Sequence, residues 1–229
     1  MEIKPLKWDN INDQEEPETE EWGQVKKVSD EILYKIKRES KQFIDGIDIR
    51  ELPIGNQTRQ ILKRMKDFEL PKPNMQLRIR TQSQLNLILV VLKIIEKHKI
   101  INEATVSTFT LNKEAWAVFM RLVDELAIKK LNLLIASSYA FRVPKEYEQF
   151  KTDSKIRNNV RLVFAWSHLK ISLFKCKKNY YQVEGSMNYS QNNMAEQILV
   201  ENNKDTYDYD YDFLNNIMTS VKQSLEIVK

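Results

Sequence analysis

The side chains in this sequence best suited to phosphate chemistry are a histidine and a lysine separated by one residue, His168 and Lys170. Near neutral pH a neutral imidazole is a competent nucleophile or proton carrier. Covalent catalysis by such a nucleophile divides one difficult displacement into two easier steps. A lysine ammonium donates to the non-bridging oxygens of a phosphate as charge builds up in the transition state. The pair therefore predicts attack on a phosphodiester.

Further polar residues follow along the same segment. Ser186 and Asn188 lie two residues apart, and Glu196 stands alone after them. The Asn188 amide is a second donor for a phosphate oxygen. We expect a helix beginning near Asn192 to present Glu196 toward the sheet, where it would accept a hydrogen bond from the other imidazole nitrogen and fix the tautomer. This chemistry requires no metal and no cofactor.

A β-hairpin is the structure predicted for the segment that carries these residues. Two apolar stretches flank a polar turn at Lys177 to Asn179. Residues two apart in an extended segment point to the same face, so His168 and Lys170 should emerge together, as should Ser186 and Asn188. A hairpin with one surface histidine and a polar turn, without catalytic function, explains the same spacing.

The quoted motifs resemble the signature of the phospholipase D superfamily, HxKxxxxD followed by GSxN or GGxN. The matching residues are His168-Leu169-Lys170 and Gly185-Ser186-Met187-Asn188. The Glu196-Gln197 pair that follows is similar to short, single-motif members from phages and bacteria. The resemblance covers about residues 76–203.

The resemblance implies both a fold and a set of roles. The fold would be an α/β domain with a phospholipase D-like mixed β-sheet flanked by helices. His168 would attack phosphorus, Lys170 and Asn188 would bind the phosphate, and Ser186 and Glu196 would inherit supporting roles, Ser186 at the phosphate.

The sequence departs from the family at two points. Lys175 stands where the family has its aspartate, which supports the histidine and the local loop. The family's second motif supplies an opposing histidine as general acid, whereas here the other histidine, His98, ends an apolar helix and is interpreted as a helix-terminal cation or a packed surface group. A two-histidine mechanism then needs two chains, so we expect a homodimer or a larger homo-oligomer.

Charge is distributed unevenly along the chain. The net charge is +4, but residues 1–31 carry −6 and residues 201–212 carry −4, which leaves the remainder near +14. A basic body is compatible with a polyanionic partner such as DNA, although a lysine-rich solvated surface has the same composition. No Gly-rich nucleotide loop is present among four glycines.

Other features bear on location. One cysteine excludes an intramolecular disulfide, and the start is acidic with no signal peptide, so we expect a cytoplasmic protein, in the host cytoplasm or the virion if a phage encodes it. The apolar run Leu85 to Ile95 is about half of the roughly 20 residues that cross a bilayer. It predicts a buried helix and no membrane partner.

Four segments are predicted in chain order. Residues 1–22 form a flexible acidic arm, in which Trp8 and Trp22 could anchor on another protein, and residues 23–73 form a helical extension. Residues 74–203 form the α/β domain. Residues 204–229 form a solvated acidic connector, with metal binding as the alternative, and a C-terminal helix.

Within the 74–203 domain, three strands are expected over residues 105–110, 131–136 and 160–166, with a helix capped by Asn112 after the first. Strand, helix and strand in succession indicate a mixed or partly parallel sheet.

Two functions remain open from the sequence. The first is a metal-independent nuclease that cleaves DNA through a phosphohistidine at His168. The second is a catalytically inactive subunit that keeps the fold for assembly, for example in a phage particle or a DNA-processing complex.

Overall fold

A computed structural model describes residues 43–44, 47–48, 52–65, 68–81, 86–190 and 195–227. The predicted arm over residues 1–22 lies outside these residues, and so do residues 23–42 of the predicted helical extension. Phe43–Ile44 (β1) and Ile47–Asp48 (β2) form an antiparallel pair.

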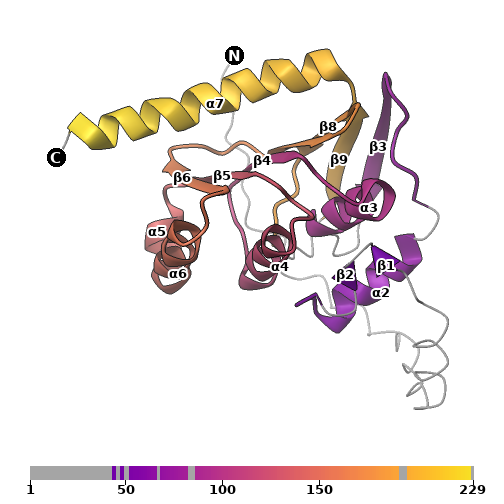
Figure 1. Ribbon diagram of the computed structural model, residues 1–229, viewed down its shortest axis with the longest axis horizontal. Helices are drawn as coiled ribbons and strands as arrows, with labels where there is room; N and C mark the ends of the chain where they lie inside the picture. The colour runs from indigo at the N-terminus through magenta and orange to yellow at the C-terminus, as the bar shows by residue number, and fades with distance from the viewer. Residues whose placement is uncertain are drawn as a thin grey trace, which may run out of the picture. The chain divides into compact units, whose positions relative to one another are not determined.

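Seven strands form one mixed sheet in the order β3-β9-β8-β7-β4-β5-β6 (Figure 1). The sheet confirms the predicted α/β class. The strands are β3 (Met75–Thr81), β4 (Glu103–Thr108), β5 (Leu131–Ala136), β6 (Val160–Ala165), β7 (Ile171–Cys176), β8 (Asn179–Gly185) and β9 (Glu196–Asn202).

Three neighbouring strands, β4, β5 and β6, run parallel. Every residue of β5 is buried, as expected for a parallel strand covered on both faces. The crossover from β4 to β5 contains α4 (Lys113–Asp124), and Asn112 Oδ1 accepts a hydrogen bond of 2.8 Å from the Ala115 backbone N–H. This contact confirms the predicted N-cap.

The other half of the sheet is antiparallel. Strands β7 and β8 form the predicted hairpin around a turn at Lys177, whose φ of 52° lies in the left-handed region. Strand β9 replaces the helix expected near Glu196, because Glu196 is the first residue of β9 and pairs with Thr81. The reason is the alternation along β9, in which Ile198 and Val200 are buried and fit a sheet rather than a helix.

Helices cover both faces of the sheet (Figure 1). One face is covered by α3 (Ile88–His98), α4, α5 (Tyr139–Arg142) and α6 (Pro144–Lys155), and the other by α7 (Lys204–Ile227). Before the sheet comes α2 (Asn56–Arg64), where Gly55 rather than Asn56 occupies the N-cap position. The first eight residues of α3 are all buried, which confirms the predicted core helix. None of the described helices has the length and apolar character needed to cross a membrane.

The acidic segment from Lys204 to Asp212 is the first part of a continuous helix, so the predicted connector is wrong. Tyr207, Leu214 and Met218 are buried at helical spacing against the sheet. Asn203 Oδ1 caps the helix by accepting from the Asp205 backbone N–H at 2.8 Å. The Tyr-Asp alternation suggested strand spacing, but the buried stripe continues past it with a period near 3.6.

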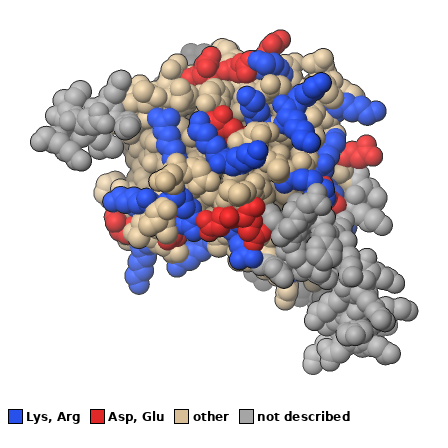
Figure 2. All heavy atoms as spheres, viewed as in Figure 1, with Lys and Arg blue, Asp and Glu red and all other residues tan. Residues whose placement is uncertain are grey.

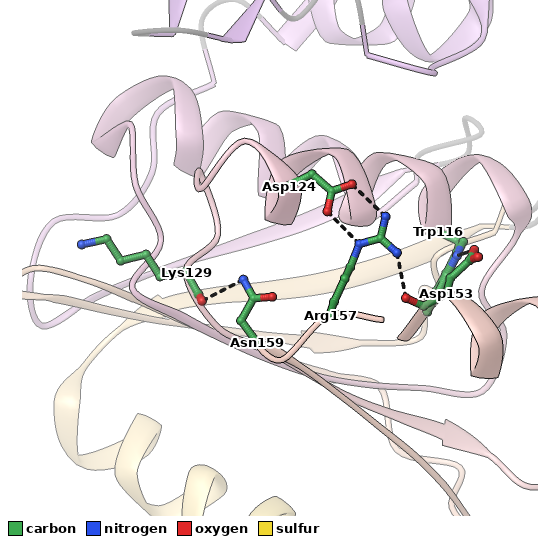
Figure 3. A network of polar contacts seen from close by, with 6 residues as sticks. All are labelled: Trp116, Asp124, Lys129, Asp153, Arg157 and Asn159. Carbon is green, nitrogen blue, oxygen red and sulfur yellow. Dashed lines mark hydrogen bonds and ion pairs between the residues drawn. The ribbon is translucent and has the colours of Figure 1, made fainter. Parts of the chain in front are cut away.

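A guanidinium joins the outer helices near the start of β6 (Figure 3). Arg157 donates to both carboxylate oxygens of Asp124, at 2.7 and 2.8 Å, and to the Asp153 carbonyl at 2.7 Å. The Asp153 carboxylate accepts from the Trp116 indole N–H at 2.8 Å. The hydrogen bond from Arg157 holds the pKa of Asp124 below its usual value. These contacts tie α4 to α6 and fix the chain that enters β6, the strand before His168.

Candidate functional site

One edge of the sheet gathers every residue that the sequence singled out for phosphate chemistry. Strands β4, β5, β6 and β8 end at this edge, and β7 and β9 begin there, as the pairings Ser107–Ile171 and Gly185–Ile198 show. We call it the motif edge and define it by residues 108–112, 137–142, 166–170 and 186–190, with Glu196. Three separate segments reach this edge, and the third is strand β9 and not the helix that was expected to carry Glu196.

His168 and Lys170 lie together in the extended segment between β6 and β7. The His168 side chain is exposed, and the Lys170 Nζ lies 3.3 Å from its Nδ1 and 3.3 Å from its carbonyl oxygen. An ammonium is only a donor, so Nδ1 acts as the acceptor and the hydrogen of a neutral ring resides on Nε2. In this arrangement the tautomer of His168 is set by Lys170.

The imidazole packs against Phe109, a residue that sequence reasoning missed. The two ring centroids are 4.3 Å apart and the planes are tilted by 49°. Arg142 reaches the same phenyl ring, with its guanidinium carbon 4.2 Å from the centroid, and donates to the Phe109 carbonyl at 2.8 Å. Phe109 follows directly after β4, and the carboxyl end of a parallel strand is a usual place for ligand-binding residues. The position of Phe109 directly after a predicted strand was the feature of the sequence that could have identified it.

The side-chain amide of Asn188 holds the loop that follows β4. Its Oδ1 accepts hydrogen bonds from Thr108 Oγ1 at 3.2 Å, the Phe109 backbone N–H at 3.2 Å and the Thr110 backbone N–H at 3.3 Å. These bonds orient the side chain and hold the loop that carries Phe109. Its Nδ2 makes no hydrogen bond to another described residue.

The segment after β8 alternates between buried and outward-facing residues. Met187 and Tyr189 are buried, and the Tyr189 hydroxyl donates to Ser172 Oγ at 2.8 Å. Burial raises the pKa of Tyr189 well above its usual value. The alternation places Ser186 and Asn188 on the other side of the segment, as predicted from their spacing.

Ser186 and Glu196 contact each other across β8 and β9. Ser186 Oγ donates to Glu196 Oε2 and accepts from the Gln197 backbone N–H at 3.1 Å. The Glu196 side chain is buried, so this contact fastens the motif segment to β9. The phosphate contact predicted for Ser186 and the action of Glu196 on His168 remain predictions.

Gly185 allows β8 and β9 to approach closely. A Cβ atom at this position would lie 2.1 Å from the Gln197 carbonyl oxygen and 2.9 Å from the Ile198 Cα. Any side chain would therefore push the two strands apart. The glycine of the motif is explained by this contact.

Lys175, at the position of the family's aspartate, lies at the opposite end of β7 from His168. It pairs with Glu103 of β4 and Tyr180 of β8, and its Nζ is 5.9 Å from the Tyr180 ring centroid. Lys175, the residue that departs from the family signature, therefore does not lie beside the imidazole of His168.

His98 is packed away from the motif edge, in the last turn of α3. Its Nε2 lies 2.9 Å from the Tyr181 hydroxyl. Burial, followed by the charges of Lys97 and Lys177, lowers the pKa of His98 below 6.5. Of the two interpretations made from the sequence, the packed group is confirmed. The lowered pKa favours the neutral ring over the helix-terminal cation.

Two cavities lie elsewhere on the described chain. One of about 440 Å³ is lined by Phe68, Glu69, Leu70, Lys93, Glu96 and Lys97. The other, of about 370 Å³, lies beside Lys130, Asn132 and Arg161. The described residues contain no group of three or more His, Cys, Asp or Glu side chains placed to hold a metal ion. In α7, Asp208 pairs with Lys204 and Asp210 accepts from Gln182.

No family model and no curated protein matches the sequence. Polyphosphate kinase from Porphyromonas gingivalis is similar in structure, at 11% identity and a TM-score of 0.47, over 76% of this chain and 29% of that one. TrmBL2, an archaeal chromatin protein, is similar at 11% identity and a TM-score of 0.42, over 82% of this chain and 62% of that one. Less than two thirds of either protein is therefore covered.

The architecture itself bears on the resemblance found in the sequence. The mixed sheet with its flanking helices has the α/β architecture that the sequence resemblance implied. The HxK and GSxN segments both lie at one edge of that sheet.

Proposed function

We propose that the motif edge binds a phosphodiester and that the chain is a metal-independent nuclease, acting on DNA through a phosphohistidine at His168. The observation that carries the proposal is the meeting of three groups at one sheet edge. Lys170 Nζ touches the imidazole, and Asn188 is bonded to the loop of Phe109, which packs against the same imidazole. A nucleophile and two phosphate donors are thereby available in one place.

The contact between Lys170 and Nδ1 of His168 determines how the first step begins. An incoming phosphate attracts the Lys170 ammonium away from Nδ1, which leaves Nδ1 free to carry the ring hydrogen. The lone pair then resides on Nε2, which attacks phosphorus. A P–N bond forms and the P–O bond to the leaving group breaks, while Lys170 and the Asn188 Nδ2 group stabilise the charge on the non-bridging oxygens.

The second step returns the enzyme to its starting state. Water attacks the phosphohistidine, the P–N bond breaks, and the phosphomonoester end is released with the new oxygen, while the proton of the water passes to the group that protonated the leaving oxygen in the first step. The leaving oxygen of the first step needs a proton, and His98 is held by Tyr181 away from the motif edge. The proposal therefore includes a two-fold dimer in which the motif edge of a second copy supplies the opposing histidine.

Charge supports a nucleic acid as the partner. The part of the sequence between the acidic ends carries a large positive excess, and Lys and Arg side chains spread over much of the face drawn in Figure 2. Cations that neutralise phosphates release counterions and attract DNA at a distance.

The test is cleavage in the presence of excess EDTA. Plasmid and single-stranded DNA are incubated with the wild type, with His168→Ala and with His98→Gln, the matched control at the other histidine. The proposal expects cleavage by the wild type and by His98→Gln, and none by His168→Ala. Equal inertness of all three proteins, each shown to be folded, would contradict it.

A second function is favoured by a specific contact. With Lys170 donating to Nδ1, the attacking nitrogen carries a hydrogen, and the aspartate of the family is missing. Such a site binds phosphate without turnover, as an assembly subunit would. This alternative expects His168→Ala to bind DNA as the wild type does and Lys170→Met to bind it more weakly. It also expects a larger, ring-like oligomer by mass measurement in solution.

A protein partner for the N-terminal arm belongs to the same alternative. Trp8 and Trp22 lie outside the described residues, so their predicted role as anchors remains a prediction.

A further inference from the structure

Two aromatic side chains beside the motif edge are almost fully exposed. Trp166 is 93% exposed and Phe141 is 88% exposed. Each ring exposes a large apolar surface that no other part of the described chain covers. Single exposed apolar residues are common on protein surfaces, so the argument depends on where these two lie.

Both residues follow the ends of neighbouring parallel strands. Ala136 of β5 pairs with Ala165 of β6, and the Ser137 backbone N–H donates to the Ala165 carbonyl at 2.7 Å. Trp166 comes directly after that carbonyl, and Phe141 lies in the short helix α5 that follows Ser137. The two rings thus leave the sheet at the edge that carries His168.

The same edge also carries cations and a further aromatic ring. Arg142, next to Phe141, lies over the Phe109 ring at 4.2 Å, and Phe109 contacts the His168 ring at 4.3 Å. Lys170 lies 6.0 Å from the Phe109 centroid. Aromatic rings and cations therefore lie together at the motif edge.

We infer that the motif edge takes a single strand of DNA, with bases stacked on Phe141 and Trp166 while a backbone phosphate lies at His168. The inference rests on the proposed function, whose substrate class it narrows. Bases of a single strand expose both π-faces to aromatic side chains, and the phosphates between them need cations. In a duplex the bases are stacked on each other, so exposed rings at a surface gain no base contact.

Binding is tested with fluorescent oligonucleotides of phosphorothioate linkage, which keep the charge and resist cleavage. Anisotropy compares single strand and duplex for the wild type, Phe141→Ala and Trp166→Ala. Loss of one stacked base weakens binding about tenfold, so each variant should bind the single strand about tenfold more weakly. The matched control is Tyr209→Ala, an aromatic residue 75% exposed on α7, which should bind as the wild type does.

Hydrolysis of a phosphodiester without nucleobases separates this inference from the proposed function. An oligonucleotide of abasic tetrahydrofuran nucleotides, in excess EDTA, should be cleaved at the wild-type rate by Phe141→Ala and Trp166→Ala. If the wild type hydrolyses it through His168 but binds duplex as tightly as single strand, or if neither variant weakens binding, the inference is wrong and the phosphodiesterase stands.

The reverse outcome is equally informative. Binding of single strands through both rings, without any hydrolysis, would support the inference and contradict the catalytic proposal. Absence of both binding and hydrolysis would overturn the two together. Because both side chains are exposed, circular dichroism should show unchanged folding for each variant.

Discussion

The side-chain oxygen of Asn188 accepts a hydrogen bond of 3.2 Å from the backbone N–H of Phe109, the residue whose ring packs on His168. The amide nitrogen of the same side chain is directed to no other described residue. One asparagine therefore serves two purposes, since its oxygen holds the loop and its nitrogen is available to a phosphate. The two purposes are separable by substitution.

Asn188→Ala and Asn188→Asp should differ in stability and agree in function. Alanine removes the acceptor of three hydrogen bonds, and we expect a loss of about 2 kcal/mol in the free energy of unfolding. Aspartate keeps an acceptor for the two backbone N–H groups. The free energy of unfolding of Asn188→Asp, measured in urea, should therefore be close to that of the wild type. Both variants should lose DNA cleavage, because neither retains the Nδ2 donor. An Asn188→Asp protein that unfolds like Asn188→Ala, or cleaves normally, would contradict this division.

Gly185→Ala should destabilise the sheet strongly. Its Cβ atom would meet the Gln197 carbonyl oxygen at 2.1 Å, which forces β8 and β9 apart. We expect a loss of about 3 kcal/mol in the free energy of unfolding. Gly55→Ala is the matched control, because the nearest atom there is a Glu114 carboxylate oxygen at 3.6 Å, an ordinary contact. That variant should change stability by less than about 1 kcal/mol, and equal losses at the two sites would contradict the account.

His98→Gln should reduce the dependence of stability on pH near neutrality. The pKa of His98 in the folded chain is lowered by burial and by Lys97 and Lys177, so the unfolded chain binds more protons in that range. The contribution of His98 to stability is fully present above the unfolded pKa of about 6.5 and is lost as the pH falls through the folded pKa. Urea unfolding of the wild type should therefore show a steeper rise with pH than that of the variant. Parallel curves would show that His98 is not the group responsible.

Arg157→Met should weaken the join between α4 and α6 without touching the motif edge. It removes the bidentate pair with Asp124 and the bond to the Asp153 carbonyl (Figure 3). The Asp124 side chain is half exposed, so we expect a loss of only about 1 kcal/mol. Thermal unfolding measures the loss, and DNA cleavage below the melting range should be unchanged. If the fully folded variant lost DNA cleavage, the contacts between α4 and α6 would be needed for the geometry of the motif edge.

The same pair makes a prediction at acid pH. Arg157 lowers the pKa of Asp124, so the pair contributes stability above the unfolded pKa of Asp124 and loses it as the pH falls through the folded one. Asp124→Asn should remove this part of the acid sensitivity.

Local patterns predicted much of the fold. The buried helix α3, the strand β5, the N-cap at Asn112 and the hairpin of β7 and β8 each follow from periodicity or turn chemistry within one short stretch. Strand β9 was not predicted, because a helix was expected from near Asn192, although Ile198 and Val200 alternate in the manner of a strand. The start of α7 was missed because the Tyr-Asp alternation conceals a helical stripe that continues only beyond it.

For the candidate site, the sequence predicted only those neighbours that follow from the spacing of residues within one extended segment. Residues two apart in extended segments lie together, which placed His168 with Lys170 and Ser186 with Asn188. The contacts of Phe109 join residues from segments distant in the sequence, and no local pattern reports them. The partner of Nδ1 was likewise unpredictable, because it depends on the rotamer of Lys170.

The most direct test of the central claim uses the fact that the chain has two histidines. Inorganic phosphate is titrated into the protein at constant pH and ionic strength while the ring signals of both residues are followed by NMR. We predict that the His168 signals move and saturate, that those of His98 stay in place, and that Lys170→Met and Asn188→Asp each abolish the movement. Signals of His168 that do not move with phosphate, or that move equally in these variants, would contradict a phosphate site at the motif edge.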